Sequence, residues 1–115
     1  MKRVKFFCLF FLLLTFLVIA NCTKAPDNIA VSSDGVKISF NVQGKGEPAV
    51  LFVHGWGGNK NVWSDQVAHF SKKYKVIAID LASFGESGNN RKLFNMSSFG
   101  ADIASVINKL KLEQV

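Results

Sequence analysis

Cysteine and proline are scarce in this sequence, with two residues of each among 115. Two cysteines cannot build a framework of several disulfide bridges or a four-cysteine zinc site, so both classes of small protein are excluded. Hydrophobic residues make up 49% of the chain and charged residues 19%, which also excludes a disordered or collagen-like chain. A chain of this length holds at most one domain.

Acidic residues are also few: eight Asp and Glu stand against fourteen Lys and Arg, which gives a net charge of +6. Lys2, Arg3 and Lys5 are clustered at the N-terminus, and the other basic residues are scattered. No basic run is interleaved with aromatic residues in the way that is typical of nucleic-acid binding. We therefore expect a mildly basic surface and no nucleic-acid partner.

The N-terminal segment reads as a targeting signal. The basic head is followed by an apolar run over Phe6–Ala20 that only Thr15 interrupts. A membrane-spanning helix needs roughly 18 or more apolar residues, whereas the apolar region of a secretory signal has roughly 7 to 15. The pattern predicts a signal peptide over residues 1–21 and an exported protein, with an uncleaved membrane anchor as the alternative.

Two cleavage sites fit this signal. Ala20 is a small residue of the kind that a general signal peptidase accepts before its cut. Alternatively, Ile19-Ala20-Asn21-Cys22 resembles the cleavage motif of bacterial lipoproteins, except that Asn21 replaces the usual small residue. That resemblance implies a lipid on Cys22, a polar tether over residues 22–28 and a protein held at a membrane. Cleavage after Ala20 would instead give a secreted or periplasmic protein.

The first part of the body predicts a β-hairpin. Ile29–Ser33 reads as a short strand, and Val36–Val42 alternates apolar and polar residues with the period of a strand that has one buried face. Between them, Asp34-Gly35 is a tight-turn dipeptide whose two residues are expected at positive φ.

The central part predicts a strand-helix-strand unit. Ala49–Val53 and Lys75–Asp80 are apolar runs of the kind found in parallel sheets, so both are expected to be covered on both faces. Between them, Trp63, Val67 and Phe70 form one stripe of a helix. Such a unit forms a right-handed crossover.

A last helix follows near the C-terminus. Its apolar stripe consists of Phe99, Ile103, Val106, Ile107 and Leu110. Ser97 or Ser98 is the predicted N-cap. Lys109 and Lys111 are expected in the last turn, where the helix dipole favours cations.

A glycine-rich turn, His54-Gly55-Trp56-Gly57-Gly58, directly follows the first apolar run. Glycines there let the backbone turn sharply, and backbone N–H groups in such a turn can face a developing negative charge. A phosphate-binding loop is excluded because no Gly-Lys-Ser/Thr follows. A plain tight turn is the alternative.

Four segments in this order resemble the α/β-hydrolase superfamily: Val50–Gly58, Trp63, Val76–Leu81 and Phe84–Ser87. The resemblance extends over residues 29–115, which we expect to form a partial α/β-hydrolase domain. It implies an α/β fold made of a β-hairpin followed by strand, helix, strand and helix. The turn looks most like those of esterases, and epoxide hydrolases, C–C hydrolases and prolyl aminopeptidases have similar turns.

The resemblance also implies roles for the turn. The backbone N–H of Trp56 would form one half of an oxyanion hole. His54 would be a structural member of this turn together with Gly55, Gly57 and Gly58, and not the catalytic base.

The loop after the second apolar run would border the active-site mouth, and Asp80, Gly85 and Ser87 are its expected site residues. Ala82-Ser83 departs from the superfamily here, because Pro-Gly is usual at these positions. A serine at a position that often needs positive φ implies local strain or a loop that has drifted from the geometry of the superfamily.

The nucleophile motif of the superfamily, Gly-x-Ser-x-Gly on a strand-to-helix turn, does not occur in the 115 residues. The segments around Ser87 and Ser98 each lack one of its glycines. We therefore expect the N-terminal part of a serine α/β-hydrolase, truncated before its nucleophile and inactive as this chain, with no catalytic residue present. The full form would act on a small ester-like substrate without a metal or organic cofactor. The alternative is a short non-catalytic lipoprotein that keeps half the fold as a binding module.

Overall fold

The computed structural model describes residues 28–115. The predicted signal peptide, Cys22 and the tether up to Asp27 lie outside the described residues. In chain order, the elements are β1 (Ile29–Val31), β2 (Lys37–Gln43), β3 (Val50–Val53), the 3₁₀ helix η2 (Lys60–Trp63), α2 (Ser64–Phe70), β4 (Val76–Ile79) and α3 (Met96–Leu110).

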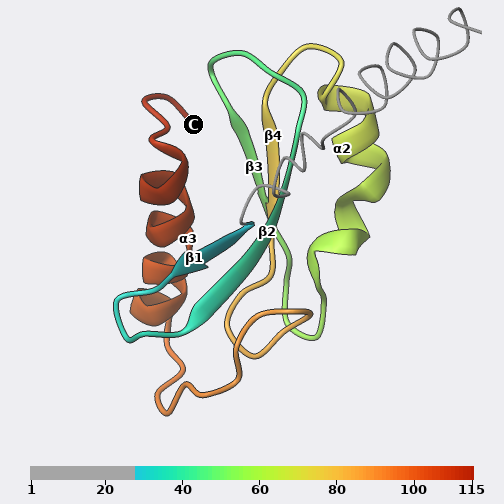
Figure 1. Ribbon diagram of the computed structural model, residues 1–115. Coiled ribbons are helices and arrows are strands. Elements are labelled where there is room, and N and C mark those ends of the chain that lie inside the picture. Colours follow the sequence, from blue (N-terminus) through green and yellow to red (C-terminus); the bar gives the residue numbers. More distant parts are fainter. Residues whose placement is uncertain (1–27) are drawn as a thin grey trace, which may run out of the picture.

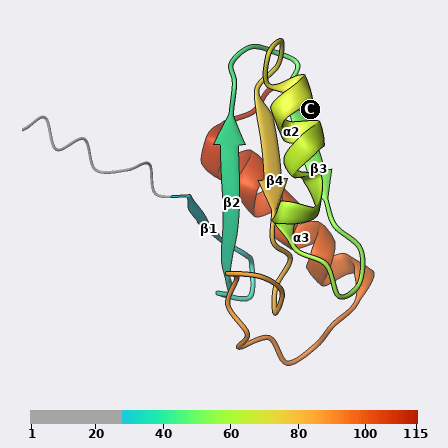
Figure 2. The ribbon, with the colours of Figure 1, turned by 90° about the vertical axis from the view of Figure 1, so that its right-hand side faces the viewer.

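The four described strands form one mixed sheet in the order β1-β2-β4-β3. β3 runs parallel to β4 with Val50 opposite Val76, whereas β2 is antiparallel to both of its neighbours. The two views in Figures 1 and 2 place α2 on one face of the sheet and α3 on the other. This three-layer arrangement confirms the predicted α/β class and the predicted order of elements.

The two apolar strands differ in burial. All four residues of β4 are buried, because β2 and β3 flank this strand and a helix covers each face. The residues of β3 are only half-buried, since β4 is its one neighbour among the described strands. The prediction that both strands are fully covered is therefore confirmed for β4 and wrong for β3.

The β1–β2 connection is a hairpin, as predicted, but its loop has three residues. The Gly35 N–H donates to the Ser32 carbonyl, and the Ser32 N–H donates to the Val36 carbonyl, each at 2.9 Å. Gly35 has a φ of +84°, whereas Asp34 is not in the left-handed region. The prediction of positive φ at both residues is wrong, because a three-residue loop requires a left-handed residue only at its last position.

The capping of α3 also differs from the prediction. Asn95 is the N-cap, and its side chain accepts a hydrogen bond of 2.8 Å from the Ser98 N–H. The Ser98 hydroxyl in turn accepts from the Asn95 N–H, which completes a capping box. Lys109 lies in the last turn as predicted, whereas Lys111 is the left-handed C-cap residue.

Candidate active-site turn and its supporting clusters

The turn after β3 and the loop after β4 lie side by side at the carboxyl ends of two parallel strands (Figure 1). Ligands of open α/β sheets bind at this end, because the loops there diverge and leave a crevice. The N-terminal part of α3 borders the same region, since Met96, Phe99 and Gly100 line a cavity with residues of the turn. The sheet therefore brings the predicted turn and the predicted loop together.

His54 joins these two segments. Its buried ring places Nε2 3.1 Å from the Leu81 N–H, which donates to it, and Nδ1 2.8 Å from the Gly55 carbonyl. One tautomer satisfies both contacts, with the proton on Nδ1. The Gly58 N–H donates to the same Gly55 carbonyl and closes the turn. Both ring nitrogens of His54 are thus occupied in holding the turn.

Trp56 lies at the tip of the turn and is 86% exposed. The next residue, Gly57, has a φ of +75°, a conformation that glycine adopts without strain. Phe84 of the loop packs against the turn, with its ring edge-on to Trp56 at 5.4 Å and to His54 at 5.3 Å. Within residues 28–115, nothing accepts a hydrogen bond from the Trp56 N–H. This donor is therefore available to a ligand.

A cavity of about 410 Å³ opens beside the turn. Its walls are almost entirely apolar, and His54 is its one ionisable lining residue. The lining comes from the end of β3, the turn, the loop and α3, and consists of Val53, His54, Gly55, Trp56, Leu81, Phe84, Met96, Phe99, Gly100 and Ile103. Such a cavity fits an apolar group of a small organic molecule.

The loop after β4 borders this cavity through Leu81 and Phe84. Asp80, Gly85 and Ser87, the predicted mouth residues, do not line it. The Asp80 carboxylate is instead buried and accepts hydrogen bonds from the Lys60 N–H at 2.6 Å, the Lys60 ammonium at 2.6 Å and the Glu86 N–H at 2.9 Å. The shape of the loop therefore depends on these residues, which lie outside the cavity.

Gly85 and Ser87 fit tightly around Asp80. A Cβ atom on Gly85, which has a φ of +53°, would come within 2.3 Å of the Asp80 carboxylate. The Ser87 hydroxyl donates to the Asp80 carbonyl at 2.6 Å and accepts from the Ser39 N–H at 2.8 Å. Because this hydroxyl is used to tie the loop to β2, the geometry gives it no nucleophilic role.

Lys60, Asp80 and Glu86 form what we call the Lys60 cluster. Burial alone would raise the pKa of Asp80, but the hydrogen bonds from the Glu86 N–H and from Lys60 outweigh burial and lower this pKa. Burial alone would lower the pKa of Lys60, and its hydrogen bonds to Asp80 and Glu86 reverse that effect and raise it. All three groups are therefore held in their charged forms.

Ser83 has a φ of +70°, which confirms the expectation of positive φ at the position where Pro-Gly is usual. Its N–H donates to the Gly88 carbonyl at 2.8 Å and closes the loop. A non-glycine residue with this φ is strained, and the contacts around Ser83 must hold it in this conformation.

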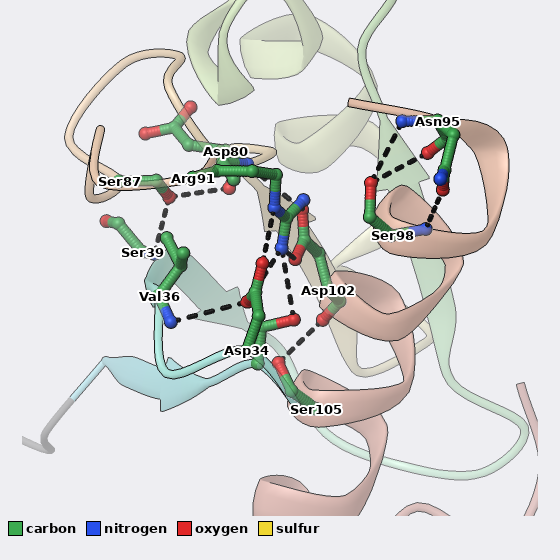
Figure 3. A network of polar contacts seen from close by, with 12 residues as sticks. Asp34, Val36, Ser39, Asp80, Ser87, Arg91, Asn95, Ser98, Asp102 and Ser105 are labelled. Atoms are coloured by element: carbon green, nitrogen blue, oxygen red, sulfur yellow. Dashed lines mark hydrogen bonds and ion pairs between the residues drawn. The ribbon is translucent and has the colours of Figure 1, made fainter. Parts of the chain in front are cut away.

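A second cluster lies beneath the loop and was not predicted (Figure 3). Arg91 is buried and donates two hydrogen bonds to Asp102, at 2.6 and 2.9 Å, and two to Asp34, at 2.8 and 3.0 Å. The hydrogen bonds with Asp34 and Asp102 raise the pKa of Arg91, and the bond from Arg91 lowers the pKa of Asp34. Asp102 also accepts from the Ala82 N–H at 3.1 Å. The Arg91 cluster thus links the hairpin, the loop and α3.

Neither a metal site nor a membrane helix is present in the part of the chain that the structure describes. No three His, Cys, Asp or Glu side chains gather there in a way that could hold a metal ion. None of the described helices is long and apolar enough to cross a bilayer.

Comparisons with known proteins agree with this architecture. A family model for the alpha/beta hydrolase fold matches residues 48–115. An esterase from Exiguobacterium antarcticum superposes with a TM-score of 0.68 at 30% identity, covering 74% of this chain and 32% of the esterase. A thermophilic esterase from Thermogutta terrifontis gives a TM-score of 0.66 at 29% identity, covering 73% and 32%.

Curated proteins match over the same region. The 3-oxoadipate enol-lactonase 2 of Acinetobacter baylyi is 26% identical over 85 residues, which are 73% of this chain and 32% of the enzyme. The biotin biosynthesis bifunctional protein of Saccharophagus degradans is 35% identical over 71 residues, covering 62% of this chain and 12% of that protein. The chain therefore spans a third or less of the length of these relatives.

The fold and the turn define an α/β domain with a glycine-rich turn at the carboxyl end of a parallel strand. The family model covers more than half of the chain, and the chain belongs to the α/β-hydrolase family.

Proposed function

We propose that this chain provides the oxyanion-hole turn of a serine α/β-hydrolase that cleaves small ester-type substrates. The observation that carries the proposal is the Trp56 N–H, which has no acceptor within residues 28–115, on a turn that lines an apolar cavity and is held by His54. The esterases and the lactonase that match this chain support an ester-like substrate.

The proposed chemistry is acyl transfer. In a longer form of the protein, a serine activated by histidine attacks the carbonyl carbon of the ester, and the histidine takes the serine proton. The Trp56 N–H and the N–H after the nucleophile donate to the oxygen on which negative charge develops. The alcohol leaves with a proton from histidine, and water then hydrolyses the acyl-serine.

Labelling of the natural protein tests this proposal. The protein is recovered from its source cells with an antibody against residues 28–115, its intact mass is measured, and it is treated with a fluorophosphonate, which modifies activated serines. We expect a mass above the 12.7 kDa of this chain and one labelled serine. A natural form of 12.7 kDa or less that resists labelling would contradict the proposal and favour the non-catalytic binding module.

Two variants of the longer form test the turn itself. Trp56→Pro removes the backbone N–H, and we expect kcat for p-nitrophenyl butyrate to fall by about 10²-fold or more. Trp56→Ala is the matched control, because it removes the exposed ring and keeps the N–H. Equal losses in both variants would show that the ring matters and that the N–H does not.

We also propose that the protein is exported and anchored by a lipid on Cys22. The apolar run before this residue and the similarity of Ile19–Cys22 to lipoprotein signals support the anchor. The mass of the N-terminal peptide tests it, with acyl chains on Cys22 as the expected result and Cys22→Ala as the control that moves the protein out of the membrane fraction. An unmodified peptide that begins at Asn21 would identify an ordinary secretory signal.

A further inference from the structure

Lys60 is an unusual residue for its position, because its side chain is only 5% exposed. Its ammonium group contacts Asp80 at 2.6 Å, the Ser39 hydroxyl at 3.2 Å and Glu86. Its backbone N–H also donates to Asp80. Apart from the contact with Ser39 of β2, its donors thus converge on the end of β4 and on the loop that follows.

A buried lysine contributes little net stability to a fold. Removing its charge from water costs free energy that the ion pair must recover, and an apolar residue of similar size often serves as well. What the ion pair adds is a fixed orientation of Lys60, since Asp80 accepts hydrogen bonds from both the backbone and the side chain of Lys60. The start of η2 is therefore fixed against the end of β4.

The position of Lys60 relates this pair to the turn. Lys60 lies two residues after Gly58, where the turn ends, and it is bound to Asp80. His54, where the turn begins, is bound to the N–H of Leu81, the neighbour of Asp80. Two consecutive residues after β4 thus hold the first residue of the turn that carries Trp56 and a residue two positions beyond its end.

We propose that Lys60 is a positioning residue, which with His54 forms a two-point clamp on the turn 54–58 and fixes the direction of the Trp56 N–H. The catalytic role of this clamp rests on the proposed function, because the direction of the Trp56 N–H affects the reaction only if this group faces an oxyanion. The clamp itself is a property of this chain. It can be measured without any activity.

The experiment compares variants of the 15N-labelled chain by NMR. Lys60→Met keeps an unbranched side chain that is one atom shorter and removes its charge, and Lys60→Arg keeps the charge. We expect Lys60→Met to speed amide exchange at Leu81 by roughly tenfold or more, since the clamp then opens locally. The Trp56 amide resonance should shift, and the His54 ring should lose its single tautomer. Lys60→Arg should restore these signals.

Lys75→Met is the matched control, because Lys75 is also paired with a glutamate, Glu47, but at 3.8 Å and away from the turn. It should leave the signals of Leu81, Trp56 and His54 unchanged. If Lys60→Met does not fold, Glu86→Gln takes its place, since it removes the outer partner of Lys60 and leaves Asp80. Smaller changes of the same signals are then expected.

The proposal is overturned if Lys60→Met, or Glu86→Gln in its place, lowers the thermal midpoint while the signals of Leu81, Trp56 and His54 stay unchanged. Lys60 would then be a stabilising residue only. In a longer, active form, Lys60→Met should lower kcat with little change in KM, and Lys60→Arg should rescue kcat. A clamp seen by NMR, together with a longer natural form that lacks esterase activity, would refute the proposed function and leave the clamp standing.

Discussion

Two buried cations organise the described part of this protein, and each lies between one buried and one more exposed carboxylate. Lys60 pairs with Asp80, which is 1% exposed, and with Glu86, which is 77% exposed. Arg91 pairs with the fully buried Asp102 and with Asp34, which is 41% exposed. The same electrostatic arrangement therefore occurs twice along the segment between β4 and α3, which carries Asp80, Glu86 and Arg91.

The two clusters differ in what they connect. The planar guanidinium of Arg91 binds both of its carboxylates in a bidentate way, and these come from the hairpin and from α3. The compact ammonium of Lys60 connects segments around the glycine-rich turn. The Arg91 cluster therefore joins the layers of the fold, whereas the Lys60 cluster shapes the candidate site.

The largest expected effect is on stability and comes from Asp102→Ala. This change leaves Arg91 buried with Asp34 as its one carboxylate partner and removes the acceptor of the Ala82 N–H, so we expect a loss of about 3 to 5 kcal/mol in the free energy of unfolding. Urea unfolding followed by circular dichroism measures it. Asp102→Asn is the control, because it keeps the shape and one acceptor and should lose less. Equal stability of Asp102→Ala and the parent chain would contradict the role of the Arg91 cluster.

The sequence predicts the layers of this fold because apolar periodicity is a local signal. The run at β4, the stripe of α3 and the glycine-rich turn were each recognisable from neighbouring residues. The positive φ of Ser83 followed from its place in the loop motif. The N-cap of α3 cannot be predicted in this way, because Asn95, Ser97 and Ser98 are all good capping residues and only the path of the chain selects one.

The two clusters could not be predicted from the sequence. An isolated lysine or arginine is normally solvent-exposed, and no local pattern marks Lys60 or Arg91 as buried. Their partners lie far away in the chain: Asp80 is 20 residues from Lys60, and Asp34 is 57 residues from Arg91. Only the tertiary fold brings these charges together. Asp80 was recognised as a residue of the loop, but its partner was not.

The next largest effect is expected at Gly85, where a side chain would collide with the Lys60 cluster. Gly85→Ala places a Cβ atom within 2.3 Å of the Asp80 carboxylate at a φ of +53°, and we expect a loss of about 2 kcal/mol in the free energy of unfolding. Gly57→Ala is the matched control, because its φ is also positive but no atom lies within 4 Å of the added Cβ. The control should lose about 1 kcal/mol. A smaller loss at Gly85 than at Gly57 would show that the loop moves away from Asp80 at little cost.

A smaller effect on stability, of opposite sign, is expected at Ser83, which lies in the loop that both clusters hold. Asp80 belongs to the Lys60 cluster and the Ala82 N–H binds Asp102, so both clusters hold the loop in which Ser83 is strained. Ser83→Gly removes the strain of the positive φ, but glycine also has more freedom in the unfolded state. The net effect should be a gain of about 0.5 kcal/mol in the free energy of unfolding. Ser83→Ala, which keeps the Cβ, should not stabilise it. Thermal unfolding distinguishes the two variants.

The smallest effect is expected at the outer carboxylates, and it depends on pH. The hydrogen bonds from Arg91 and Lys60 lower the pKa of Asp34 and of Glu86, so each carboxylate stabilises the folded state above its unfolded pKa. That contribution is lost as the pH falls through the lower, folded pKa. Asp34→Asn and Glu86→Gln should therefore be slightly less stable than the parent at neutral pH, and the difference should disappear as the pH falls through the lowered folded pKa. Urea unfolding across this range measures the difference. A gap that stays constant with pH would mean that the charge of these carboxylates is irrelevant, and that each cluster depends only on its buried pair.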